Sequence, residues 1–167
     1  MRVTRSGGTS ARAGAVADDL RVLTVRQPWA WAIIHGGKDV ENRTRNIAGA
    51  WRGLVAIHAG LHPYEQDNAS SRAHRAARGT KVDTRIVFGA VIGVVDLTHV
   101  HPDCTEIVMG YGETPVCSAW AMSDNWHLCF ANPRPLAQPI PAKGRLGLWR
   151  PDEELRAAIL DQVGAVA

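Results

Sequence analysis

Short apolar runs separated by polar turns dominate the chain and predict several short strands with few helices. Residues 22–25 are apolar around a single threonine and predict a strand. Pro28 suits the first turn of a helix, because its missing N–H costs nothing there. Residues 29–35 are apolar on most faces and predict a largely buried helix, which Gly36 and Gly37 end.

Alternating charges mark the next predicted strand, residues 38–45. Val40 and Asn42 would lie on one face of it. The opposite face would carry four charged side chains: Asp39, Glu41, Arg43 and Arg45. Such a face either borders a solvated cleft or belongs to an edge strand that resists aggregation through charge, and the sequence leaves both interpretations open.

The rest of the pattern predicts further strands and three helices, one of them short. Residues 86–95, rich in β-branched side chains around two glycines, predict a central and bent strand. Residues 102–119 lack clear periodicity and predict a loop with a short helix, whereas 132–135 predict a turn. The other expected elements are strands at 54–57, 126–130 and 143–149, a polar helix over 61–78 and a helix opened by Pro151. Together they predict an α+β domain on a small barrel.

The organisation expected along the 167 residues is a single domain with two flanking segments. Residues 1–20 predict a disordered tail without a secretory signal, 21–150 the domain, and 151–167 a C-terminal helix packed on the domain or trailing it. The three cysteines are an odd number without a C-x-x-C pair, which argues against a disulfide framework and a zinc knuckle. We therefore expect a cytoplasmic protein without membrane segments.

Positive charge is concentrated in one stretch of a mildly basic chain, whose net charge is +3 and whose pI is about 9.0. The stretch is either a solvated helix face or a patch that contacts phosphates. It comprises Arg72, Arg75, Arg78, Lys81 and Arg85.

Several motifs in order resemble one family. Leu23-Thr-Val-Arg-Gln-Pro-Trp-Ala, followed by Gly37-Lys38-x-x-Glu41-x-Arg43, is similar to the signature of the ASCH domain, which is named for homology to a transcriptional coactivator. Further segments that fit the pattern are 53–59, 89–97, and 126–136 with 143–149. The resemblance implies a PUA-like barrel of five to six strands with flanking helices, as in YTH and EVE domains. It also implies a cleft beside the first helix that takes RNA or a modified base.

A few members of the family are hydrolases, and this resemblance implies catalytic candidates. Enzymes that cleave an acyl group from a modified cytidine use a lysine, a threonine three residues on and a later carboxylate. Carried over, these positions are Lys38, Glu41 in place of the threonine, and Asp96. Another relative is assigned ribonuclease activity, for which Lys38, Glu41 and His58 would be acid/base groups. Whether the chain is an enzyme stays open.

The same residues could instead bind or support structure. Arg43 and Lys38 would contact phosphate and Glu41 a base amino group, or the three would form ion pairs at the cleft edge. Arg26 and Gln27 precede the first helix, whose N-terminus is a potential anion site, although Gln27 could equally cap that helix. The predicted nucleic-acid-binding set is Arg26, Gln27, Trp29, Lys38, Arg43, Arg45, His58, Trp126 and His127.

The six tryptophans divide by context. Trp31 and Trp51 lie in apolar or strand segments and are predicted to be core residues. Trp29, Trp120 and Trp126 lie next to polar loop residues and are candidates for base stacking, with residues 123–127 as one pocket wall.

Histidine spacing raises the question of a metal. His58 and His62 have the helical i, i+4 spacing, but His58 sits at a transition from strand to turn. His99 and His101 share a strand face near Cys104, without a third ligand at a strong spacing. We expect neither a metal nor another cofactor.

The sequence therefore predicts a protein that binds nucleic acid, RNA first and DNA second, as a single strand or at a modified base. The alternative is a small hydrolase that acts on RNA or on an acylated nucleoside through Lys38 and Glu41. A third interpretation is a protein-interaction or transcriptional accessory domain. The oligomeric state is not predicted.

Overall fold

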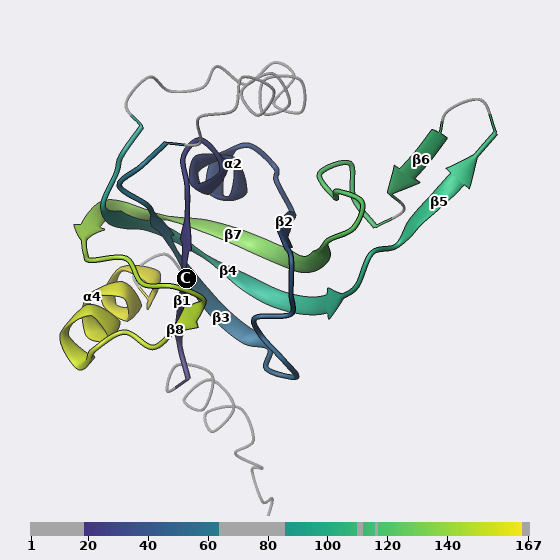
Figure 1. Cartoon of the computed structure of the whole chain (residues 1–167). Coiled ribbons are helices and arrows are strands. Elements are labelled where there is room, and N and C mark those ends of the chain that lie inside the picture. The colour runs from purple at the N-terminus through teal and green to yellow at the C-terminus, as the bar shows by residue number, and fades with distance from the viewer. Residues whose placement is uncertain (1–18, 64–85, 110–111, 116, 165–167) are drawn as a thin grey trace, which may run out of the picture.

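A six-stranded mixed sheet forms the body of the computed structural model, which describes residues 19–63, 86–109, 112–115 and 117–164 (Figure 1). The sheet order is β2-β7-β4-β3-β1-β8; β1 and β3 are parallel and the other pairs are antiparallel. Its strands are β1 Arg21–Val25, β2 Val40–Arg43, β3 Gly53–Ala59, β4 Ala90–His101, β7 Trp126–Pro141 and β8 Leu148–Trp149. A separate hairpin joins β5 Thr105–Val108 to β6 Gly112–Pro115.

Two helices cover opposite faces of this sheet. Helix α2 (Trp29–His35) packs on the inner, concave face, where Ile33 and Ile34 join one apolar cluster. Helix α4 (Glu153–Gly164) packs on the outer face, where Ile159 is fully buried in a second cluster (Figure 1). Neither described helix is long and apolar enough to cross a membrane.

Strand β4 is central, as its continuous apolar pattern predicts, between β7 and β3. Gly93 in its middle lets α2 approach closely: a Cβ there would lie 2.6 Å from the Cδ1 of Ile34. The sheet curls far enough that Arg43 on the edge strand β2 donates a hydrogen bond to the Thr24 carbonyl of β1 (3.1 Å). The predicted α+β fold, a six-stranded barrel-like sheet with flanking helices, is confirmed.

Two local predictions are wrong. The segment 102–119 contains the β5–β6 hairpin instead of a short helix. The turn predicted at 132–135 is absent, because β7 runs through it with register shifts against β4. Proline lacks an N–H and cannot donate a hydrogen bond to a neighbouring strand. On one side of β7, however, the pairing with β2 extends only as far as Cys129. The prolines beyond that point lie on a strand with one paired side, where a missing donor is tolerated.

Some predictions fall outside the described residues. These are the basic stretch from Arg72 to Arg85, nearly all of the 61–78 helix and most of the N-terminal tail.

Candidate functional site

The turn before α2 uses its polar groups for its own structure. The buried side chain of Gln27 accepts a hydrogen bond from the Trp31 N–H (3.0 Å) and donates one to the Val87 carbonyl (2.7 Å). The amides of Trp29 and Ala30 donate to the Arg26 carbonyl at 3.0 and 3.2 Å. The first-turn amides are therefore satisfied within the chain, and the predicted anion site at this helix N-terminus lacks its donors. The Arg26 side chain is exposed.

A continuous series of ion pairs links the start of β2 to β1. The Nζ atom of buried Lys38 donates to the Val40 carbonyl and to Glu41 Oε2, at 3.0 Å for the carboxylate. The other oxygen of Glu41 lies 3.2 Å from the Arg43 guanidinium, which also contacts Thr24. Glu41 thus bridges two cations on the inner face.

Indole rings surround these charges. Trp29 lies 5.9 Å from Lys38 Nζ, measured to the ring centroid, and meets the Trp120 ring edge-on at 6.2 Å. Trp126 is paired with Arg43 across β2 and β7, which places both side chains on one face. We call this group the α2–β2 cluster; it comprises Trp29, Lys38, Glu41, Arg43, Trp120 and Trp126.

A loop of residues 117–122, the 117–122 loop, supplies Trp120 to the cluster. Asn42 on β2 donates to the Trp120 carbonyl and accepts from the Met122 N–H, both at 2.9 Å. The Ser118 hydroxyl donates to the Asp39 carboxylate at the start of the same edge. Sequence patterning did not place this loop, because its contacts lie about 80 residues away along the chain.

The structure does not bring Asp96 to Lys38 and Glu41. Asp96 lies between Val95 and Leu97, whose side chains fill the inner cluster, so its carboxylate points to the outer face. There it accepts hydrogen bonds from Arg134 (2.9 Å) and Asn132 (2.8 Å). The catalytic trio implied by the resemblance is therefore not assembled.

His58 also lies on the outer face, alternating with Ile57 and Ala59 of the inner cluster. Its Nε2 lies 2.9 Å from the Ala142 carbonyl, and Gly144 covers the ring so closely that a Cβ there would be 2.8 Å from Cε1. Burial lowers the pKa of His58, an effect that the carbonyl only partly offsets. It is a packed structural imidazole, apart from the α2–β2 cluster.

The remaining predicted residues divide in the same way. Arg45 is exposed just beyond β2. His127 is fully buried and lies on the face of β7 opposite Trp126, with Nδ1 close to the sulfurs of Cys104 (3.5 Å) and Cys117 (3.4 Å). Trp31 is buried as predicted, whereas Trp51 is half-buried and donates to Asp19.

Comparison with known proteins gives matches in sequence and in structure, although no protein-family model matches. The chain is 28% identical over 136 residues to mouse activating signal cointegrator 1 and 27% identical over 135 residues to the human protein. Each match covers 80% of this chain but spans 22% of the relative's length.

Solved structures similar to this chain include ASCH from Zymomonas mobilis and a point mutant of that protein. Both show 19% sequence identity and a TM-score of 0.48. They cover 85% and 84% of this chain, and 93% and 96% of their own chains. The sequence matches are to an activating signal cointegrator, the kind of coactivator after which the ASCH family is named. They agree with the motifs at 23–43, which are similar to the signature of the ASCH domain.

Proposed function

We propose that the chain binds single-stranded nucleic acid, RNA in preference to DNA, through the α2–β2 cluster. Lys38 and Arg43 would contact phosphates, and exposed Arg26 and Arg45 would extend the positive surface at the two ends of this region. Glu41 would accept a hydrogen bond from a base amino group.

Aromatic stacking would supply the contacts to the bases. Trp29, Trp120 and Trp126 are all half-buried, so each residue keeps part of its surface accessible. Stacking on an aromatic side chain contributes about 1–3 kcal/mol per base and tolerates any base. This chemistry favours an unpaired strand, whose bases are free to leave the stack.

The observation that carries the proposal is the Nε atom of Arg43. It is buried and has no hydrogen-bond partner among the described residues. A buried donor without a partner costs about 1–3 kcal/mol, which an acceptor on a ligand would relieve. The Nε of Arg134 is also unpaired, but that side chain binds Asp96 on the outer face and has no indole cluster beside it.

The test is fluorescence anisotropy with labelled single-stranded RNA and DNA of the same sequence over a salt series. We expect RNA to bind more tightly, with log K falling by about 0.7 per phosphate contact for each unit of log salt. Arg43→Ala should weaken binding and reduce that slope by about 0.7. Arg43→Lys keeps the charge without the Nε–H donor, so it should weaken binding while retaining the slope.

The matched control is Arg156→Ala on α4, where the guanidinium pairs with Glu153 on the other side of the sheet. It should leave the RNA affinity unchanged. Absence of binding to either nucleic acid at low salt would refute the proposal.

A second candidate function is RNA hydrolysis, favoured by the 3.0 Å contact between Lys38 and Glu41. However, Nζ of Lys38 already donates to Glu41 and to the Val40 carbonyl, whereas a lysine nucleophile or base needs a free lone pair. We therefore expect RNA to remain intact on denaturing gels after prolonged incubation. Cleavage that disappears in Lys38→Ala, with the fold retained, would establish the hydrolase instead. The unpaired cysteines lead us to propose a reducing, cytoplasmic setting for either activity.

A further inference from the structure

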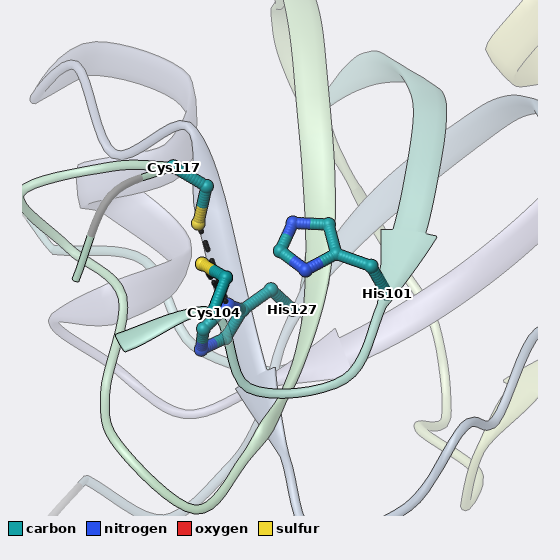
Figure 2. A group of neighbouring side chains, drawn as sticks. All are labelled: His101, Cys104, Cys117 and His127. Atoms are coloured by element: carbon teal, nitrogen blue, oxygen red, sulfur yellow. Dashed lines mark hydrogen bonds between the residues drawn. The ribbon is translucent and has the colours of Figure 1, made fainter. Parts of the chain in front are cut away.

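Four potential metal ligands converge on the outer side of the sheet, where the β5–β6 hairpin joins it. One ligand atom from each of His101, Cys104, Cys117 and His127 lies within 4.8 Å of the other three (Figure 2). His101 and His127 are register partners at the ends of β4 and β7. Cys104 precedes β5 and Cys117 follows β6, so the two cysteines flank the hairpin.

The distances from His127 to the two sulfurs are those of a tetrahedral zinc site. Zinc binds thiolate sulfur at about 2.3 Å and imidazole nitrogen at about 2.0–2.1 Å, so tetrahedral geometry separates a sulfur from a nitrogen by about 3.6 Å. The Nδ1 of His127 lies 3.5 Å from the Cys104 sulfur and 3.4 Å from the Cys117 sulfur. Figure 2 shows both sulfurs on the same side of this ring.

A second observation concerns the orientation of the His127 ring, which is completely buried. Its Nε2 lies 2.9 Å from the Met122 carbonyl, an acceptor that requires a proton on Nε2. The tautomer that results leaves the lone pair of Nδ1 directed at the two sulfurs. A backbone carbonyl that holds the far nitrogen of a ligating histidine is the usual outer support of zinc sites.

His101 is fixed similarly. Its Nδ1 lies 2.7 Å from the Pro102 carbonyl and its ring meets that of His127 edge-on at 5.1 Å. Two thiolates and two neutral imidazoles balance the double positive charge of Zn²⁺, so the site would be electrically neutral.

We propose that His101, Cys104, Cys117 and His127 bind one Zn²⁺ ion in a structural site. The ion fastens both ends of the β5–β6 hairpin to β4 and β7. Figure 1 shows that hairpin extending away from the six-stranded sheet. The ion also fixes the start of the 117–122 loop, which carries Trp120. Binding releases the two thiol protons to solvent, because zinc binds cysteine as thiolate.

The experiment measures zinc in the full chain, purified under reducing conditions without chelators and without metal-affinity resin. Elemental analysis should find one zinc ion per chain. Replacement by Co²⁺ should give the intense visible bands of a tetrahedral site and an ultraviolet thiolate charge-transfer band. A chain that takes up no metal, either as purified or after reconstitution with Zn²⁺, overturns the proposal.

Variants identify the ligands. Changing an outer partner of a zinc ligand costs about 10–100-fold in affinity, so loss of a direct ligand by Cys104→Ser or Cys117→Ser should cost more. Cys117 is exposed, so the serine variant should fold, and near-unchanged far-ultraviolet circular dichroism would verify this.

Cys129→Ser is the matched control, because that sulfur lies 3.5 Å from His101 Nε2 but outside the group of four. It should keep the zinc ion and the full cobalt charge-transfer intensity. Loss of metal in Cys129→Ser with retention in Cys117→Ser would refute the ligand assignment. A Cys104–Cys117 disulfide in the reduced preparation, seen by mass spectrometry, would refute the site.

Discussion

Among the described lysines, arginines and carboxylates, Lys38 is the one that is buried, with only 4% of it exposed. A buried ammonium needs a carboxylate, and Glu41 provides it at 3.0 Å. Glu41→Ala should therefore destabilise the fold by about 3 kcal/mol, because it leaves Lys38 and Arg43 without their shared counter-charge. Chemical denaturation measures this change.

The double variant Lys38→Met with Glu41→Leu tests the reason for that loss. If the penalty comes from an unpaired buried charge, the apolar pair should restore most of the stability that Glu41→Ala removes. Equal stability of the single and double variants would contradict this explanation. Glu153→Ala, on an exposed ion pair of α4, is the control and should leave the stability almost unchanged.

The sequence predicted the residues of this ion-pair series but not their geometry. Alternation along β2 correctly placed Glu41 and Arg43 on one face, because side chains two apart in a strand share a face. The same alternation applies along β3 and β4. The residues on either side of His58 and of Asp96 lie in the inner cluster, so His58 and Asp96 lie on the outer face. The sequence motif did not reveal which face the cluster occupies, since this depends on how the sheet curls.

At the scale of elements, the 117–122 loop behaves as an addition to the edge of β2. The Asn42 side chain forms one hydrogen bond with the backbone of Trp120 and one with the backbone of Met122. Asn42→Ala should destabilise the protein by about 1–2 kcal/mol and release the Met122 amide to hydrogen exchange. Asn42→Asp keeps the acceptor for the Met122 N–H but loses the donor to the Trp120 carbonyl. The Met122 amide should therefore stay protected from hydrogen exchange, although the loop is held less firmly.

Hydrogen exchange followed by NMR or mass spectrometry distinguishes the two variants. Unchanged protection of the Met122 amide in Asn42→Ala would show that other contacts hold the loop. The control is Asn46→Ala, whose side chain caps its own turn through Ala48 and Gly49 and should leave the Met122 amide unaffected.

Strands with a clear apolar pattern could be predicted from the sequence, whereas strands with a weak pattern were missed or ended too early. Strand β4 was evident because its first half is buried on both faces and rich in β-branched residues. The β5–β6 hairpin was missed because its sequence does not alternate clearly and it forms a two-stranded sheet of its own, outside the six-stranded one. The predicted strand ended at 130 because prolines follow. The observed β7 continues through them, because beyond Cys129 it no longer pairs with β2 and needs fewer N–H donors.

For the whole molecule, the four-residue Cys/His group illustrates what a linear motif cannot show. His101 and Cys104 are three apart, but His127 joins them because β4 and β7 are antiparallel neighbours in a particular register, and Cys117 because β6 pairs back on β5. A shift of one residue in that register would move His127 to the inner face of the sheet and away from the other three ligands. The signal available was the H-x-x-C spacing at 101–104 with two further ligands downstream.

The proposed zinc site and the proposed RNA surface share the 117–122 loop, so their ligands should be coupled. Zinc fixes the loop at Cys117, and Trp120 contributes its ring to the α2–β2 cluster three residues later. We expect removal of zinc to weaken RNA binding by about fivefold, equivalent to about 1 kcal/mol. By reciprocity RNA should tighten zinc binding by the same factor, which competition with a chromophoric chelator measures.

Trp120→Ala separates coupling from simple unfolding. It should weaken RNA binding while leaving the zinc affinity of the free chain unchanged, because the ring contact of this indole is with Trp29 on α2. In this variant the effect of zinc on RNA affinity should disappear, since the ring that transmits it is missing. An RNA affinity that is identical with and without zinc in the unmodified chain would mean that the loop is positioned without the metal, and that the two sites act independently.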